Sequence, residues 1–358
     1  MHDEIERDEM KNESDPNPVR TSSHFRRFFK IRGMTPALTA FVGFVIIYIA
    51  FGLINPMVFS SGNLMNLLRS MSKYLLIGVG QSYVLITANI DLSIGSVVGM
   101  SAMISATLMT MGVHPMIAIL IAMGSCMLIG FTNGFLVGKF RLPPFIATLG
   151  TMFIARGIAY IVNGNRNTDA ISSGIGKEAA DNIQNFFYYG KTLGVYNTFW
   201  IAIVLFAAFF FLLSKTRTGR HIYAIGSNLD AAKLSGVNVE ITTTTVYLVS
   251  AFCSGVVGLI LCAQAGMGNM EAGIMYEMYG VAAGVIGGIS PMGGTGILLG
   301  TLAGAAVWQT LENGLNMVGA QVGIQRVVIG VIVVFSVLLE VVLRGGTKIK
   351  RAGNASNK

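Results

Sequence analysis

The sequence predicts an all-α, polytopic membrane protein with about ten transmembrane helices, including Gly-interrupted helices in two related halves. Of its 358 residues, 53% are hydrophobic and only 12% are charged, whereas a soluble domain has roughly 25% charged residues. The mean hydropathy is +0.64. The net charge of +8 requires no nucleic-acid partner, because the cytoplasmic loops of membrane proteins collect Lys and Arg.

Residues 1–34 are predicted to be a polar cytoplasmic tail. Acidic and basic residues are mixed there, beginning with "MHDEIERDEM". A signal peptide would begin with a short basic stretch followed by an apolar core, and this segment has neither feature. Four basic residues precede the first span, namely Arg26, Arg27, Lys30 and Arg32.

Ten segments approach the roughly 20 apolar residues that a spanning helix needs. They are residues 35–54, 64–88, 94–112, 115–138, 144–163, 197–214, 242–264, 278–289, 296–316 and 324–343. The second contains the polar stretch "GVGQSYVLITAN", and the eighth is short and rich in Gly. Together they predict a transmembrane domain over residues 35–343, followed by a basic cytoplasmic tail at 344–358.

The charges in the loops predict the orientation of the chain in the membrane. With ten spans and a cytoplasmic N-terminus, three basic regions face the cytoplasm: Lys139 with Arg141, the loop 215–240 and the C-terminal tail. The loop 164–196 is then extracytoplasmic, and its three basic residues are balanced by three acidic ones. The positive-inside bias favours this arrangement. We therefore expect a multi-pass membrane protein with both termini in the cytoplasm.

The first interrupted segment is "ANIDLSIGSVVG" at 88–99, where Asn89, Asp91 and Ser93 separate two apolar runs. A charge at the centre of the bilayer costs about 2.5–3.5 kcal/mol when it faces lipid, so Asp91 should face protein or water. Asp91 or Ser93 can cap a helix that begins near Ile94. Capping is favoured over direct contact with a solute, although the two roles are compatible. This pattern indicates an interrupted helix beside a solute pathway.

The second interrupted segment is "GGISPMGGTG" at 287–296. Ser290 is predicted to cap a helix whose first residue is Pro291. This segment can be laid on the first one, with Ile90 on Ile289 and Gly95 on Gly294. Paired, Gly-interrupted apolar segments point to the binding site of a transporter built from repeats. The pathway residues expected here are Gly287, Gly288, Ser290, Gly293 and Gly294, with Glu277 at the outer end of the eighth span.

The loop 215–240 is too long and too patterned for a simple connection. Asn228 is predicted to cap a two-turn helix that begins at Leu229, and Gly236 to end it just after Ser235. Its apolar residues form the pairs Leu229–Ala232 and Ala231–Leu234 on different sides, so no single stripe results. Such a helix either sits in a partner's groove or packs on its own chain.

The residues that could carry catalysis are scattered. No HExxH, cysteine pair or Walker A motif is present, and Glu178 follows Gly176-Lys177 where a P-loop requires Ser or Thr. Cys126, Cys253 and Cys262 all fall in apolar runs and are expected to pack. Glu312, Glu340, Arg156 and Arg326 lie near spans at several depths, whereas a proton relay needs ionisable groups in one layer. We expect no catalytic residues, metal or cofactor.

Four stretches together resemble the permease subunit of bacterial ABC importers for monosaccharides, the ribose/galactose/xylose branch. They are "NIDLSIGSVVGM", "LPPFIATLGTMFIARGIAY", "KTRTGRHIYAIGSNLDAAKLSGVNV" and "YEMYGVAAGVIGGISPMGGTGILLGTLAGA". The resemblance covers about residues 40–343. It departs from the family pattern at Tyr279, where the family has Asp, and at Gly287–Pro291.

The resemblance implies a permease dimer around a central pathway, most simply a homodimer in the lipid bilayer of the bacterial inner membrane. It also implies an extracytoplasmic sugar-binding protein and a cytoplasmic ABC ATPase that hydrolyses ATP. The loop 215–240 then resembles the coupling helix that docks into the ATPase. The residues carried over to this role are Arg217, Gly219, Arg220, Asn228, Ala231, Ala232, Leu234 and Gly236.

The predicted function is ATP-driven uptake of a monosaccharide, with no covalent chemistry on this chain. One alternative is a permease for another small polar solute, such as inositol, an autoinducer sugar or a nucleoside. Another is a secondary transporter driven by an ion gradient, which broken helices also fit. An intramembrane enzyme would need a converging nucleophile and base, which the sequence does not offer.

Overall fold

The computed structural model describes residues 34–328, 330–331 and 334. The elements in chain order are α2 (Met34–Ile54), η1 (Pro56–Phe59), α3 (Ser61–Ile86), α4 (Ile94–Thr110), α5 (Pro115–Gly138), α6 (Pro144–Ile161), α7 (Ser172–Ile175), α8 (Lys177–Gln184), η2 (Asn185–Tyr189), β1 (Lys191–Thr192), β2 (Val195–Tyr196), α9 (Asn197–Lys215), α10 (Arg217–Ser227), α11 (Leu229–Leu234), α12 (Val239–Ala265), α13 (Tyr276–Ile286) and α14 (Leu298–Met317). The two short strands pair as an antiparallel ribbon.

The predicted class, an all-α polytopic membrane protein, is confirmed. Nine of the ten predicted spans coincide with α2, α3, α4, α5, α6, α9, α12, α13 and α14. Five of the described helices, α2, α5, α6, α9 and α12, are long and apolar enough to cross a membrane. The tenth predicted span, 324–343, lies largely outside the described residues, as do the two predicted tails.

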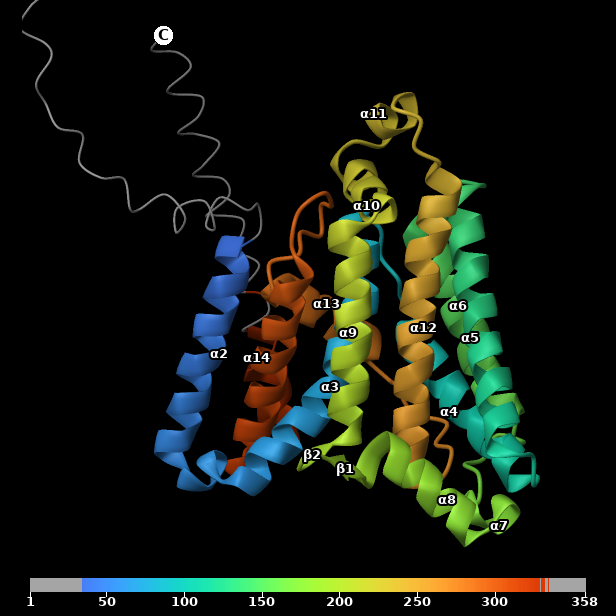
Figure 1. Ribbon diagram of the computed structural model, residues 1–358, viewed down its shortest axis with the longest axis vertical. Helices are drawn as coiled ribbons and strands as arrows, with labels where there is room; N and C mark the ends of the chain where they lie inside the picture. Colours follow the sequence, from blue (N-terminus) through green and yellow to red (C-terminus); the bar gives the residue numbers. More distant parts are fainter. Residues whose placement is uncertain (1–33, 329, 332–333, 335–358) are drawn as a thin grey trace, which may run out of the picture.

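Two long helices form the centre of the bundle. From Met71 to Ile86, α3 is almost entirely buried, and α12 is buried along most of its length. α12 packs against α3, α4 and α5, while α3 also packs against α9, α13 and α14. Figure 1 shows α3 and α12 among these neighbours, with α2 and α14 on one side and α5 and α6 on the other.

The outer helices present apolar side chains away from the protein. Ile46 on α2, Leu120 on α5, Phe153 on α6 and Val204 on α9 are all more than half exposed. Such faces are costly in water but suit hydrocarbon, where every backbone polar group is already paired within a helix. The bundle is therefore built to be surrounded by lipid.

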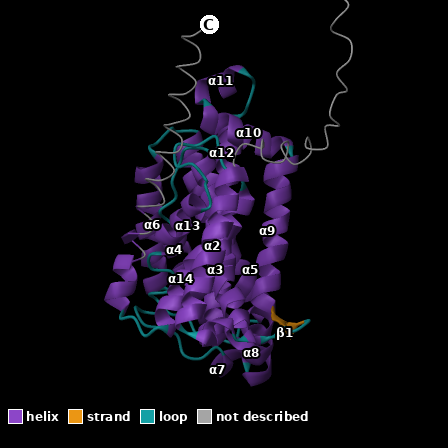
Figure 2. Ribbon diagram, turned by 90° about the vertical axis from the view of Figure 1, so that its left-hand side faces the viewer, coloured by secondary structure: helices purple, strands orange, loops and turns teal. Residues whose placement is uncertain are grey.

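The connecting segments separate to opposite ends of the bundle. α10 and α11 lie at one end, here called the α11 end (Figures 1 and 2), and the first residues of α2 lie at the same end (Figure 1). The loop after α5, with Lys139 and Arg141, lines a cavity with α11 residues at this end. α7, α8 and the ribbon lie at the other end, called the α8 end (Figures 1 and 2). The basic loops predicted to share one side therefore do so, opposite the 164–196 segment.

Candidate functional site

The first interruption separates α3 from α4 at residues 87–93 and buries a carboxylate. Asp91 is 1% exposed. Its Oδ1 accepts from the backbone N–H of Ser93 at 2.9 Å and from the Ser93 hydroxyl at 2.6 Å, and its Oδ2 accepts from the Ser250 hydroxyl at 2.7 Å. Ser93 occupies the N-cap position of α4 but makes no side-chain capping bond. Of the two predicted capping residues, Asp91 is therefore the one that satisfies a backbone donor at the start of α4.

A chain of buried polar side chains extends from Asp91 across four helices. The Asn133 amide on α5 donates to the Ser93 hydroxyl at 3.0 Å, and the Thr151 hydroxyl on α6 donates to Asn133 Oδ1 at 2.6 Å. With Ser250 on α12, the network joins α5, α6 and α12 to the start of α4. Asn133, Thr151 and Ser250 were not predicted from the sequence. A polar residue inside an apolar span was the available signal, and many such residues bond only within their own helix.

The predicted start of a helix at Pro291 is wrong. α13 ends at Ile286, α14 begins at Leu298, and residues 287–297 form turns instead. Ser290 accepts from the Met292 N–H at 3.3 Å, and its own N–H donates to the Thr295 carbonyl at 3.1 Å, so it closes a turn. Gly293, Gly294 and Gly296 have φ values of +81°, +69° and +121°. These left-handed values cannot continue a right-handed helix.

The two interruptions meet at the α11 end of the bundle. The N–H of Gly294 donates to the carbonyl of Ile86, the last residue of α3, at 2.8 Å. A Cβ atom on Gly293 would lie 2.8 Å from the Cβ of Ala88. Gly287 lies against the Gly300 carbonyl, and Gly288 has a φ of +85° and lies against Pro36. The predicted residues Gly293 and Gly294 thus contact the first interruption directly, whereas Asp91 and Ser93 belong to the network described above.

Glu277 lies apart from the glycine turns. It is half-buried in the first turn of α13, while the glycines follow the last turn of that 11-residue helix. The Glu277 carboxylate lies where a Cβ atom on Gly95 would be. Beside it, Arg156 of α6 donates to the carbonyls of Met270 at 2.9 Å, Ala272 at 3.0 Å and Gly95 at 3.1 Å. Glu277 and Arg156 therefore flank the first turn of α4 and the segment before α13.

The loop 215–240 forms two short helices, and the cap and the terminator predicted for the second are both present. Asn228 Oδ1 accepts from the Ala231 N–H at 2.9 Å at the start of α11. Gly236, with a φ of +80°, donates to the Lys233 carbonyl at 2.9 Å after its end. Ala232 is buried and Ala231 exposed, and Leu234 is 91% exposed. The helix begins at Leu229 as predicted and ends at Leu234, one residue before the predicted end.

α10 connects α11 to both interruptions. Its N-cap, Thr216, accepts from the Gly219 N–H at 3.3 Å, and Gly219 is buried against the carbonyl of Leu213. Arg217 and Arg220 of this helix are exposed. At its other end the Tyr223 hydroxyl donates to the Gly296 carbonyl at 2.7 Å. Burial raises the pKa of Tyr223 to about 12.

Gly226 is the residue at which α10 touches both interruptions, and no sequence pattern pointed to it. A Cβ atom there would overlap the Ile86 carbonyl oxygen and lie 2.6 Å from the Gly294 nitrogen. Only glycine allows backbones to approach this closely. The backbone of α10 is therefore in direct contact with both the end of α3 and the 287–297 turns.

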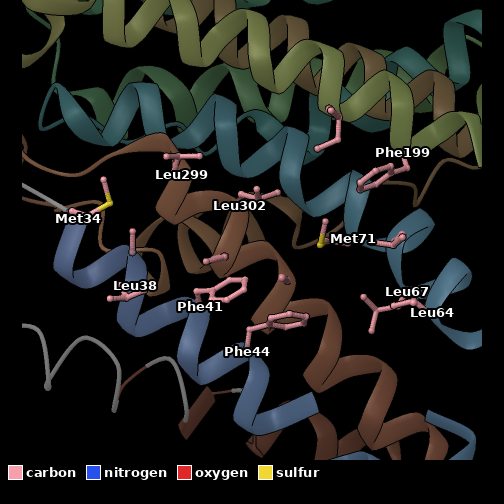
Figure 3. Close-up of a pocket in the computed structure, with 15 residues that line it drawn as sticks. Met34, Leu38, Phe41, Phe44, Leu64, Leu67, Met71, Phe199, Leu299 and Leu302 are labelled. Atoms are coloured by element: carbon pink, nitrogen blue, oxygen red, sulfur yellow. The ribbon is translucent and has the colours of Figure 1, made fainter. Parts of the chain in front are cut away.

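Two cavities differ sharply in chemistry. The first, about 730 Å³, opens beneath α11 and is lined by polar and charged groups that include Asn89, Asn228, Lys139, Arg141 and Lys233. The second, about 820 Å³, lies between α2, α3, α9 and α14 and is lined only by apolar side chains (Figure 3). A polar solute finds hydrogen-bonding partners in the first and none in the second.

Comparison with known proteins identifies the class of this bundle. A family described as the permease component of branched-chain amino acid transport systems matches residues 63–337. The chain belongs to this permease family. Its members are transport components, so this permease is not an enzyme. No solved structure matches it.

The relatives of this permease include several named for sugars. It is 35% identical to the ribose import permease of Haemophilus influenzae over 311 residues, which are 86% of this chain and 94% of the relative. It is 33% identical to the galactose/methyl galactoside import permease of Escherichia coli over 303 residues, 80% of this chain and 88% of the relative. The D-allose permease of Escherichia coli is 32% identical over 299 residues, 82% of this chain and 88% of the relative.

Proposed function

We propose that this chain is the permease subunit of an ABC importer that moves a monosaccharide into a bacterial cell. The observation that carries the proposal is the similarity, over at least four fifths of the chain, to permeases for ribose, allose and galactose. The family description names branched-chain amino acids, but each of these relatives is named for a sugar. The α10–α11 pair supplies a physical route for coupling.

The α11 end faces the cytoplasm in this proposal and docks on the ATPase. Lys139, Arg141, Lys215, Arg217 and Arg220 all lie in the segments at this end, which agrees with the positive-inside bias. Leu234 projects from the tip of α11 almost fully exposed, and a groove on the ATPase that buries it gains hydrophobic free energy. The α8 end faces the solute-binding protein.

Coupling runs from α11 through α10 to the two interruptions. Movement of the ATPase displaces α10, and the contacts of Gly226 and Tyr223 transmit that displacement to Ile86 and to the 287–297 turns. Both interruptions then change together, because Gly294 is bonded to Ile86. The pathway runs beside these segments and is completed by a second permease subunit, most simply another copy of this chain.

Reconstitution tests the function. The full chain is placed in proteoliposomes with its ATPase and solute-binding protein, and accumulation of labelled D-ribose, D-allose and D-galactose is measured. We expect ATP-dependent accumulation of at least one sugar and none with ADP. Accumulation driven by an ion gradient without the ATPase would instead establish a secondary transporter. Accumulation of leucine but of no sugar would contradict the assignment of substrate.

A further inference from the structure

The apolar groove between α2, α3, α9 and α14 continues into a basic cavity at the α11 end. The groove is lined by residues from Met34 and Leu299 at one end to Leu64 and Phe199 at the other (Figure 3). A third cavity, also of about 730 Å³ but distinct from the one beneath α11, has Met34 and Leu299 in its lining as well. Its other lining residues include Lys215, Arg220 and Tyr223. The two hollows therefore border each other at these two residues, and together they are called the amphipathic site here.

The charge of the polar cavity is of one sign. Its described lining contains two cations, Lys215 and Arg220, and no Asp or Glu. Hydroxyl groups that could donate to an anion are supplied by Ser214 and Ser227, whereas the Tyr223 hydroxyl already donates to the Gly296 carbonyl. Two cations among hydroxyl groups, open to the surface, form a site for an anion such as a phosphate ester.

The length of the apolar groove fits one leaflet of a bilayer. Met34 and Phe44 both line it and are ten residues apart on α2, which is about 15 Å at roughly 1.5 Å per residue. Half of a hydrocarbon core of about 30 Å is the same length. Leu38 and Phe41, also on its wall, are 44% and 53% exposed, so the groove opens sideways to surrounding lipid.

We propose that this site binds one anionic phospholipid of the leaflet at the α11 end, with an acyl chain in the groove and the phosphate beside Lys215 and Arg220. The phosphate then lies against α10 and the Gly294–Gly296 turn, which also line the polar cavity. The binding itself does not depend on the proposed transport function. The bound phosphate would stabilise α10 against the second interruption, and the effect of this stabilisation on coupling rests on that function.

Lipid retention tests the site without any transport assay. The full chain is reconstituted in nanodiscs with equal amounts of phosphatidylglycerol and phosphatidylcholine bearing identical acyl chains. The protein is then released from the nanodiscs, and the lipids that stay bound to it are measured by native mass spectrometry. We expect retention of phosphatidylglycerol on the order of tenfold above phosphatidylcholine, because each nearby cation favours an anionic headgroup. The double variant Lys215→Gln/Arg220→Gln should lose this preference. The matched variant Arg217→Gln, changed on the same helix as Arg220 but outside the cavity lining, should keep it.

The groove is tested separately with a phosphatidylglycerol that carries a photoreactive acyl chain. We expect the cross-link to map to α2, α3 or α14 in the wild type, and to disappear in Ala303→Phe, which fills the groove. Leu38→Trp narrows the groove from its exposed wall and serves if Ala303→Phe fails to fold, while Ile46→Trp is a control on the same helix outside it. The proposal would be overturned if the wild type retained both lipids equally or if the double variant kept the preference for phosphatidylglycerol. A cross-link that mapped to other helices would also overturn it. So would a disulfide between two copies of a Leu38→Cys variant, because the groove would then be covered by a second copy of the chain.

Discussion

Asp91 satisfies donors that would otherwise be buried without partners. Its two oxygens accept from the Ser93 N–H, the Ser93 hydroxyl and the Ser250 hydroxyl, and Ser93 in turn accepts from Asn133. A buried donor left unsatisfied costs about 1–3 kcal/mol. The residue therefore stabilises the junction of α4 with α5 and α12, whatever else it does in transport.

Replacing Asp91 with Ala should destabilise the fold by about 2–4 kcal/mol, because Asp91 is the acceptor for the Ser93 N–H and for the Ser250 hydroxyl. Asp91→Asn should recover most of this, since an amide oxygen still accepts and the Ser250 hydroxyl can rotate to accept from the amide. The measurement is thermal unfolding in detergent. Thr132→Ala is the control, because the Thr132 hydroxyl donates within its own helix, to the carbonyl of Leu128. An Asp91→Ala protein with unchanged thermal unfolding would show that the network adds nothing.

Gly226 should be intolerant of even one methyl group. Its Cβ would overlap the Ile86 carbonyl oxygen, and buried backbones cannot relax as a flexible side chain can. We expect Gly226→Ala to insert into membranes and to lose most sugar-stimulated ATPase activity in the reconstituted complex. Gly150→Ala on α6 should behave as wild type, because, apart from its chain neighbours and the backbone of its own helix, no atom lies within 4 Å of the added Cβ. If the Gly226→Ala complex kept full sugar-stimulated ATPase activity, the close contact of α10 with the two interruptions would not be needed for coupling.

At the scale of the element, α11 is too short to be stable alone. Its six residues fall well below the length of about 12–15 residues at which isolated helices become marginal in water. Asn228 and Gly236 pair its terminal groups, and Lys233 lies 3.7 Å from Asp230, one turn away. These local bonds hold an element whose apolar tip, Leu234, has little contact with the rest of the chain. An exposed tip on a capped helix is suited to a partner's groove.

Leu234→Asp should weaken association with the ATPase by about tenfold, because burial of a leucine side chain contributes roughly 1.5–3 kcal/mol. The fold should be unaffected, since Leu234 is 91% exposed. Leu193→Asp provides a control of equal chemistry at the α8 end, where Leu193 is 88% exposed. Affinity is measured by titrating the ATPase onto the permease in nanodiscs. Equal affinities for wild type and Leu234→Asp would place the docking surface elsewhere.

At the scale of the whole molecule, the helices formed by apolar segments could be predicted from the sequence, whereas the contacts between distant segments could not. Nine of the described helices lie where runs of apolar residues predict spans, because the bilayer demands long helices and tolerates little else. The cap at Asn228 and the end near Gly236 were also predicted, since both depend on neighbouring residues. Ser290 was misread because capping chemistry was weighed without the positive φ of Gly293, Gly294 and Gly296. Gly226 was missed because its partners are about 70 and 140 positions away in the chain, and no local pattern records them.

The orientation of the bundle is the prediction on which the docking and binding-protein surfaces both depend. A single cysteine at a highly exposed position of each end reports it, using Leu234→Cys at the α11 end, where Leu234 is 91% exposed, and Leu193→Cys at the α8 end, where Leu193 is 88% exposed. The native Cys126, Cys253 and Cys262 are buried, so they should add little background. In intact cells a membrane-impermeant maleimide should label Leu193→Cys and leave Leu234→Cys unlabelled until the inner membrane is opened.

Because the positive-inside bias acts on the basic loops at the α11 end, exchanging Lys139, Arg141, Lys215, Arg217 and Arg220 for Gln should lower this asymmetry of labelling. Labelling of Leu234→Cys in intact cells would put α11 outside, where it cannot meet a cytoplasmic ATPase.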